Sequence, residues 1–412
     1  MTRAPASPSP GRRPDPSFVK APLAAAAFLA VALTAGSGAL AADAVSPIKG
    51  TTVDFSMTIR TSLSSQYDNT LLLENNEPVS LLLDFQAPRL AGCEQKLRWR
   101  CDNGRLEFAD SELRNRFFPP PAAAVTAIEA ELGLFPRRDG LTLPTPLLTN
   151  KAMLRVISPS PGSLLQMGEI DGCRIGDFLD PTDLGLRRNL NLDGSYAALH
   201  PDRFLSPRAL YLVDDVSRNL PISRHFRLGD FALDFPWFSL GKRQYMALDY
   251  GLVRKLEDLV DEMNRAGLPG DKIRLLFGFR SPAFSAERNI READDSLQAS
   301  FSLHLYGKAA DFILDADGDL RLDDLDHDGQ ITVRDTIPLI RCVNNLDRRY
   351  RAKGGSLFGG AGVAVRHEFP ERPVQSPYIH VDTRGFLDEK GNLIRWPDRW
   401  PGTGDPIDWD RL

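Results

Sequence analysis

The spacing of apolar residues changes along this chain, and that change constrains the fold more than any other feature. Up to about residue 160, apolar and polar residues alternate in short runs, as expected for half-buried strands. These runs cover residues 53–59, 79–85, 96–101, 126–132 and 152–157, and turn-rich segments at 119–121 and 159–162 lie between them. Short strands with no helical pattern between them predict a β-sandwich-like domain over residues 42–180.

The C-terminal part, residues 241–412, has a different pattern. Apolar residues at helical spacing over residues 250–266, followed by Gly267, predict a helix that ends at a glycine. Apolar runs typical of buried strands follow at residues 273–279, 309–314 and 378–381. We therefore expect an α+β fold class, with a small antiparallel sheet and helices in this domain. Residues 181–240, which have weak periodicity, are expected to connect the two domains.

The first 41 residues have the composition of a secretory signal peptide. Four cations precede an apolar stretch over residues 21–33, and Ala-Leu-Ala at 39–41 offers a small-residue cleavage site. We expect an exported protein, periplasmic or on the cell surface, that begins near Ala42; the alternative is an uncleaved Ala-rich anchor. No later apolar run reaches the ~18 residues of a spanning helix, so no stable membrane insertion is expected after cleavage.

The net charge and the four cysteines indicate which partners and which disulfide bonds can be expected. The formal net charge is −5, and removal of residues 1–41, which carry four cations and one anion, would make it −8. A chain of this charge has no electrostatic footprint for nucleic acid, so no such partner is expected. Four cysteines in an exported chain suggest disulfides, with three possible pairings. Cys93 and Cys101 are close enough in sequence to close a hairpin-like loop, which would leave Cys173 to pair with Cys342.

His304 and His380 are the histidines whose spacing from acidic residues suits a metal site. His304 lies seven residues before Asp311, and a turn at Gly307 could bring the imidazole and the carboxylate together. His380 lies on a later predicted strand, where Asp382 shares its face at period two. Zinc accepts imidazole nitrogen and carboxylate oxygen, and a catalytic zinc takes three protein ligands and a water. The sequence therefore suggests a zinc site formed by His304, Asp311 and His380.

These residues also carry a resemblance to a known family. Residues 302–311 contain Ser-x-His-x-x-Gly-x-Ala-x-Asp, His-Val-Asp follows at 380–382, and Phe-Gly-Phe-Arg-Ser-Pro at 277–282 looks like the G-[YF]-R-S strand end of the same group. Over about residues 245–400 the chain resembles the zinc D-alanyl-D-alanine metallopeptidase superfamily. That superfamily includes peptidoglycan D,D-carboxypeptidases, D-Ala-D-Ala dipeptidases and phage L-alanyl-D-glutamate endolysins. The resemblance implies a zinc-peptidase domain that acts on peptidoglycan peptides.

The resemblance implies roles for single residues. The zinc ligands would be His304, Asp311 and His380. Arg280 would contact the scissile carbonyl and stabilise the developing oxyanion. Ser302 would lie behind a ligand and orient it.

One position departs from the family pattern. Well-known members carry a Glu or Asp general base three residues before the last histidine, and Pro377 stands there in this chain. Asp382 is the first substitute for the base, and His367 and Glu368 are others. Two functions follow: an exported zinc-dependent peptidase that hydrolyses bonds in peptidoglycan stem peptides, or a non-catalytic cell-wall-binding protein that keeps the peptidase fold and is stabilised by calcium. A calcium-dependent adhesion or structural protein is a third, which the intact ligand residues disfavour.

An acidic insertion at residues 315–335 lies between the predicted zinc ligands. It contains eight aspartates and two arginines, a net charge of −6 in 21 residues, and a divalent cation would offset their repulsion. Residues 324–335 fit an EF-hand loop, with Gly329 at position 6, and we expect a structural calcium ion there. A poorer second loop begins with Asp315, Asp317 and Asp319. The predicted calcium ligands are Asp324, Asp326, Asp328, Gln330, Thr332 and Asp335.

Overall fold

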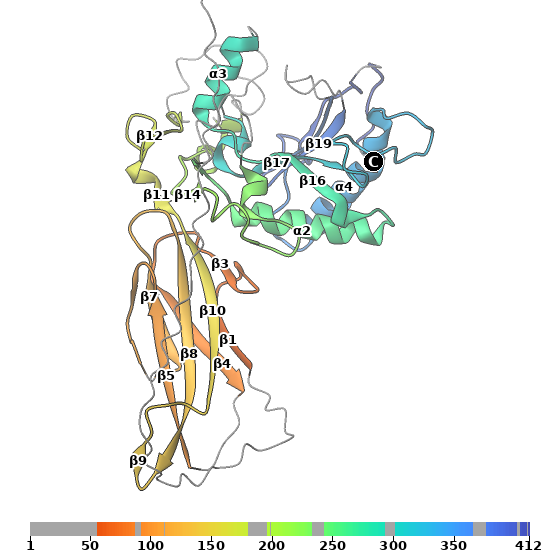
Figure 1. The fold of residues 1–412 in the computed structure, drawn as a ribbon. Helices are drawn as coiled ribbons and strands as arrows, with labels where there is room; N and C mark the ends of the chain where they lie inside the picture. Colours follow the sequence, from red (N-terminus) through yellow and green to blue (C-terminus); the bar gives the residue numbers. More distant parts are fainter. Residues whose placement is uncertain are drawn as a thin grey trace, which may run out of the picture. The chain divides into compact units, whose positions relative to one another are not determined.

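The structure is a computed structural model of the 412-residue chain. It describes residues 56–86, 92–110, 112–179, 196–197, 199–232, 243–292, 301–365, 376–401, 404–409 and 411–412. The predicted signal peptide at 1–41 and the candidate bases His367 and Glu368 lie outside these residues. Within them the fold is mixed α+β, mostly sheets with three α-helices, as predicted (Figure 1). No helix in this described part is long and apolar enough to cross a membrane.

Two sheets formed by residues 56–158 share one hydrophobic core. The first sheet has the order β1 (Ser56–Thr61), β4 (Val79–Gln86), β7 (Arg114–Phe118) and β6 (Arg105–Leu106). The second has the order β2 (Gln66–Tyr67), β3 (Thr70–Leu72), β10 (Leu148–Ser158), β8 (Ala124–Arg138) and β5 (Cys93–Cys101), and β9 (Leu141–Thr142) pairs with β8. Leu83 and Phe117 of the first sheet are buried with Trp99 and Leu154 of the second. Two sheets packed through their apolar faces form a β-sandwich.

Short elements follow the sandwich strands. A three-stranded sheet consists of β11 (Ser160–Pro161), β14 (Ala209–Val213) and β15 (Gln244–Met246), and β12 (Glu169–Ile170) pairs with β13 (Cys173–Arg174). The 3-10 helices are η1 (Gly162–Leu164), η3 (Pro201–Arg203), η4 (Leu228–Phe231), η5 (Gly270–Lys272), η6 (Leu303–Tyr306) and η7 (Val333–Asp335).

A five-stranded sheet forms the centre of the C-terminal part. Its order is β16 (Ile273–Phe277), β17 (Ala309–Leu314), β19 (Pro377–Asp382), β18 (Ala361–Val365) and β20 (Arg395–Trp396). The three α-helices are α2 (Tyr250–Arg265), α3 (Pro282–Glu292) and α4 (Thr336–Ala352). Apolar residues of α2 and α4 are buried in the same core cluster as those of the sheet. The predicted helix at 250–266 and the predicted strand at 309–314 are both present.

The predicted Cys93–Cys101 disulfide is wrong. Cys93 and Cys101 are the first and last residues of the nine-residue strand β5, not the two sides of a loop. A strand rises about 3.3 Å per residue, which separates their Cα atoms far beyond the ~7 Å that a disulfide can span. The structure has no bond between Cys173 and Cys342, and that pairing stays a prediction.

Candidate metal centre

The three predicted zinc ligands come from three neighbouring elements. His304 lies in η6, Asp311 in β17 and His380 in β19, and the antiparallel register of the two strands places Asp311 opposite His380. Gly307 ends η6 with a φ of 65° and turns the chain into β17. A Cβ at this position would lie 2.4 Å from the carbonyl oxygen of Ala247, so only glycine fits without a shift of the backbone. The turn that the sequence predicted at Gly307 is therefore present.

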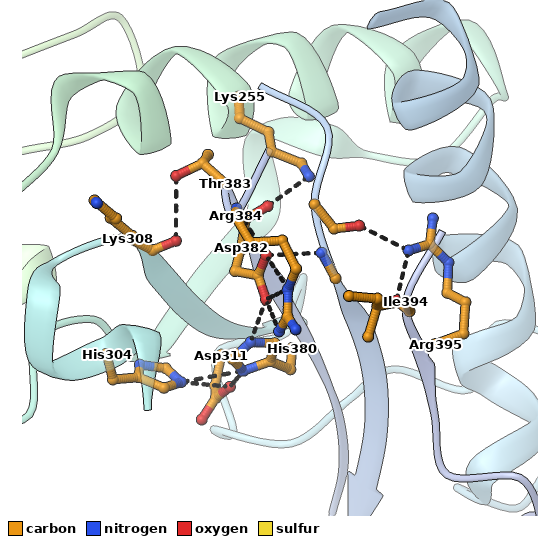
Figure 2. A network of polar contacts seen from close by, with 12 residues as sticks. Lys255, His304, Lys308, Asp311, His380, Asp382, Thr383, Arg384, Ile394 and Arg395 are labelled. Atoms are coloured by element: carbon orange, nitrogen blue, oxygen red, sulfur yellow. Dashed lines mark hydrogen bonds and ion pairs between the residues drawn. The ribbon is translucent and has the colours of Figure 1, made fainter. Parts of the chain in front are cut away.

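The potential ligand atoms of these residues face one another (Figure 2). His304 Nε2 lies 3.2 Å from Asp311 Oδ1 and 3.1 Å from His380 Nδ1. His380 Nδ1 lies 2.8 Å from the same carboxylate oxygen. The three ligand atoms thus lie within 4.8 Å of one another. Two imidazole nitrogens and one carboxylate oxygen form the donor set that a catalytic zinc ion takes, with a fourth position open.

In each imidazole, the ring nitrogen that is not a potential ligand contacts another residue. This contact turns the potential ligand nitrogen toward the centre. His304 Nδ1 lies 2.6 Å from the carbonyl oxygen of Gly278, which can only accept, so Nδ1 carries the hydrogen and Nε2 is free to bind a metal ion. His380 Nε2 lies 3.4 Å from Asp382 Oδ2. Contacts of this kind fix the tautomer of a metal-binding histidine. The residues present therefore fit a zinc ion.

Burial and neighbouring charges shift the pKa values of His304 and His380 in opposite directions. Burial lowers the pKa of His304 to about 4, and the positive Arg280 adds to the shift. Burial also opposes the charged form of His380, but hydrogen bonds with Asp311 and Asp382 outweigh it and raise its pKa to about 9. For Asp311, the effects of His304 and Arg280 outweigh burial and hold its pKa well below the usual value. At neutral pH the metal-free centre therefore contains a neutral His304, a charged His380 and a carboxylate.

Arg280 lies at the same centre, three residues after the end of β16. Its Nη2 contacts Asp311 Oδ2 and lies 3.3 Å from His304 Nε2. Its guanidinium carbon lies 4.9 Å from the centre of the Phe277 ring. Asp311 thus presents one carboxylate oxygen to the two histidines and the other to a cation. Arg280 therefore lies beside the predicted ligands, and its predicted role at the scissile carbonyl stays a prediction.

Ser302 comes immediately before η6, and its carbonyl oxygen accepts a hydrogen bond from Leu305 N at 2.9 Å. Among the residues described, no hydrogen bond joins its hydroxyl to His304, Asp311 or His380. Its predicted role behind a ligand stays a prediction.

The contacts of Asp382 differ from those expected of a proton acceptor at the metal centre. Its buried carboxylate accepts hydrogen bonds from Gly360 N at 2.7 Å and from Arg384, whose Nε lies 3.0 Å from both oxygens. Burial would raise the pKa of Asp382, but Arg384 and His380 together hold it well below the usual value. The carboxylate also faces the outer nitrogen of His380, away from the converging ligand atoms. This geometry fits a residue that positions His380.

Sequence reasoning missed the residues that surround Asp382. A Cβ on Gly360 would lie 2.6 Å from Asp382 Oδ2, and one on Gly362 would lie 2.4 Å from the Trp396 side chain. The run Gly-Gly-Ala-Gly at 359–362 was the available signal, because glycines inside a strand often mark a close approach of other groups.

The acidic insertion forms a loop whose carboxylates converge. Gly329 N donates to Asp324 Oδ2 at 2.8 Å, and buried Asp335 accepts from Leu325 N at 2.8 Å and from Thr332 N at 2.7 Å. Carboxylate oxygens of Asp324, Asp326 and Asp335 lie within 4.8 Å of one another. The other predicted ligands belong to the turns of the same loop: Asp328 Oδ1 accepts from Gln330 N, and Thr332 Oγ1 accepts from Arg334 N.

The second acidic loop differs from the expected one in one residue. Asp315 and Asp317 converge with Asp323 rather than with Asp319. Asp319 is exposed and accepts a hydrogen bond from Arg321 N at 2.8 Å. The chain turns back at Leu320, whose φ is 71°, and this turn brings Asp323 to the cluster.

The fold and the site define an α+β protein with a candidate metal centre of two histidines and one carboxylate. No family model matches the chain, and no curated protein matches it. Among solved structures, the D0-D1 domain of Intimin matches 25% of this chain and 47% of its own chain, at 7% identity and a TM-score of 0.16. A likeness of this size supports no statement about fold or function.

Proposed function

We propose that this chain is an exported zinc-dependent peptidase that hydrolyses peptide bonds in peptidoglycan stem peptides. The observation that most supports the proposal is the convergence of His304 Nε2, Asp311 Oδ1 and His380 Nδ1. These residues occupy the ligand positions of the metallopeptidase superfamily that the sequence resembles. The signal-like segment at 1–41 is consistent with a substrate outside the cytoplasm.

The proposed chemistry divides between the metal ion and Arg280. Bound zinc would polarise the scissile carbonyl and activate the attacking water. Arg280 places its guanidinium beside Asp311 and His304, where it would donate to the carbonyl oxygen as negative charge develops. Its contact with the Phe277 ring limits its movement before the substrate binds.

The reaction also needs a proton acceptor. Val365, the last residue of β18, pairs with Pro377, the first residue of β19. Val365 therefore lies beside the position where the superfamily carries its base. His367 and Glu368 follow Val365 by two and three residues in the sequence, and we propose them as the candidate bases in place of Asp382.

We further propose that calcium binds the loop at 324–335 and fixes the start of α4. Carboxylates of Asp324, Asp326 and Asp335 converge, and Asp335 directly precedes the first residue of α4. Oxygen donors at these loop positions are those of an EF-hand. The role proposed for calcium is structural.

Metal content and activity of the same preparations test the proposal. Wild type should contain one zinc per chain and cleave peptidoglycan fragments, and His304→Ala should lose both while it keeps calcium. His225→Gln is the control, because His225 is also paired with a carboxylate, Glu257, but lies outside the centre and is less buried than His304. Calcium without zinc in wild type after purification with added zinc would refute the peptidase.

A non-catalytic cell-wall-binding protein is the second candidate, and Pro377 at the position of the base is the observation that favours it. It predicts that zinc-loaded wild type co-sediments with peptidoglycan and releases no peptide fragment. Glu368→Gln and His367→Gln distinguish the two: loss of activity in either variant, with zinc retained, supports the enzyme and identifies the base.

A further inference from the structure

We propose that a cavity between α4 and the C-terminal segment of the chain binds the C-terminal carboxylate of a peptide, at a place separate from the candidate metal centre. The cavity has a volume of about 670 Å³ and is lined by α4 together with residues from 388–395 and 406–409. This volume lies within the ~300–1,000 Å³ of pockets that enclose small ligands. Binding here needs no metal ion, and only the expected source of the peptide rests on the proposed function.

Three residues of α4 line the cavity, and each carries hydrogen-bond donors. Asn344, Arg348 and Arg351 are four and three residues apart, so they form one stripe along the helix. Arg351 Nη2 donates to the carbonyl oxygen of Gly391 at 3.0 Å, and none of the described carboxylates forms an ion pair with it. Two guanidinium groups at this spacing can donate to the same carboxylate, and such charge-assisted hydrogen bonds are strong.

Asn344 adds an unsatisfied donor to this stripe. It is 2% exposed, and its Oδ1 accepts a hydrogen bond from Arg395 Nε at 2.8 Å. Because a guanidinium can only donate, this contact identifies which amide atom is the oxygen. The other atom, Nδ2, is buried and has no hydrogen-bond partner among the residues described. A buried donor without a partner destabilises the empty protein, and an oxygen atom of a ligand would remove that cost.

The charges around the cavity favour a ligand with a single negative charge. Three arginines and two aspartates line it, which gives a formal charge of +1. Asp388 Oδ1 accepts hydrogen bonds from Lys390 N at 2.9 Å and from Asn392 N at 2.7 Å, within its own turn. Asp408 forms an ion pair with Arg411 at 3.1 Å. Both aspartates thus have partners of their own, but they would repel an anion with two charges, such as phosphate.

Much of the remaining lining is apolar and suits a small side chain next to that carboxylate. Leu393, Ile407 and Trp409 line the cavity. The indole of Trp409 is held in place, because its Nε1 donates to the carbonyl oxygen of Pro397 at 3.1 Å. The last residues of a peptide offer the groups that this lining requires: one carboxylate for the arginines, a carbonyl oxygen for Asn344 and an apolar side chain.

The cavity and the candidate metal centre lie on opposite sides of β20. Successive side chains of a strand point to opposite faces. Arg395 lines the cavity, whereas the ring of the next residue, Trp396, lies 4.9 Å from the ring of His380. In Figure 2, Arg395 accordingly lies apart from the three converging ligands. If the proposed function holds, a peptide in this cavity is a second stem peptide that anchors the chain to the wall, not the one that is cleaved.

NMR of the tryptophan indole N–H groups tests the proposal, because Trp409 reports on the cavity and Trp396 on the metal centre. Full-length protein, purified with calcium and without zinc, is titrated with acetyl-dialanine and with its C-terminal amide. The free acid should shift the Trp409 signal until the site is saturated. The amide should bind at least about tenfold more weakly, because it lacks the charge. A shift of the Trp396 signal alone, no shift at all, or equal binding of the amide would overturn the proposal.

Two variants and a matched control locate the binding. Arg351→Gln should weaken binding of the free acid about tenfold or more. Asn344→Asp keeps the acceptor for Arg395 but replaces the donor with a negative charge, so it should weaken binding even if Arg351→Gln fails to fold. Arg349→Gln is the control, because Arg349 lies on the same helix but pairs with Glu262 outside the cavity. Unchanged affinity in the folded Arg351 variant, or in the Asn344 variant if that one is needed, or an equal loss in the control, would overturn the proposal.

The configuration of the probe distinguishes two sources of such a peptide. Tighter binding of the D,D form supports a peptidoglycan stem peptide, as the proposed function implies. Tighter binding of the L,L form supports the same site with an ordinary peptide end as its ligand. A wild type that binds no zinc refutes the proposed function, but the titration is made without zinc and still decides the inference.

Discussion

Zinc binding should release about one proton per ion at pH 7, because His380 has a raised pKa. In the metal-free protein, hydrogen bonds with Asp311 and Asp382 outweigh burial and raise this pKa to about 9, so about 99% of His380 is charged at pH 7. His304, with a pKa of about 4, is already neutral. Zinc can bind His380 Nδ1 only after that proton leaves, and two pKa units correspond to about 2.7 kcal/mol of lost affinity.

The sign of the pH dependence follows from the same values. Between about pH 4 and pH 9, each unit of falling pH should weaken zinc affinity about tenfold, since one further proton must be displaced. Titration calorimetry at pH 7, in buffers that differ in ionisation enthalpy, measures the released protons directly. Asp382→Asn removes one of the two hydrogen bonds that raise the pKa of His380 and should reduce the release. No proton release from wild type at pH 7 would refute this account of the centre.

Three further perturbations have expected results. Gly307→Ala, which places a Cβ against a carbonyl oxygen at a φ of 65°, should lower the thermal midpoint more than Gly140→Ala, which has a φ of 79° and open space around it; equal losses would contradict the steric argument. Lys255→Met removes the donor to two buried oxygen atoms, one of them on Asp347, which keeps its ion pair with Arg395. It should cost about 1–3 kcal/mol for each acceptor left unsatisfied in a denaturant titration, against about 1 kcal/mol or less for exposed Lys151→Met. Removal of metal by EDTA should lower the thermal midpoint, and added calcium should restore the part of this loss that zinc alone does not restore. Asp335→Asn should abolish the effect of calcium. Full recovery of the thermal midpoint with zinc alone would refute a structural calcium ion.

The parts of the fold with a regular local pattern were predictable from sequence. Apolar spacing located α2 and β17 because each element buries one continuous set of side chains. The convergence of the candidate ligands was also predictable, since His304 and Asp311 lie within ten residues and a glycine turn is needed between them. The Cys93–Cys101 disulfide was predicted wrongly because the two cysteines are close in sequence and a loop was assumed between them. Instead, both belong to one extended strand, β5.

The residues around Asp382 could not be predicted in this way, because strand register brings them together. Gly360 precedes β18, Arg384 follows β19, and Trp396 lies in β20, which pairs with β18 in parallel. No local pattern relates these positions, and an arginine two residues after an aspartate is unremarkable in a sequence. The Asp382–Arg384 ion pair is important because both side chains are buried, and their burial depends on the assembled sheet.

The acidic insertion and the metal centre are linked through the elements between them. The insertion follows β17, which carries Asp311, and ends at α4, which carries Asp347. It also contacts the start of β19, because Leu322 N donates to Ser376 Oγ at 2.8 Å, one residue before that strand begins. Asp347 in turn binds Lys255, which holds the carbonyl oxygen of Asp382. An ion that fixes this insertion would therefore act on both strands that carry candidate metal ligands and on the helix that anchors the second of these strands.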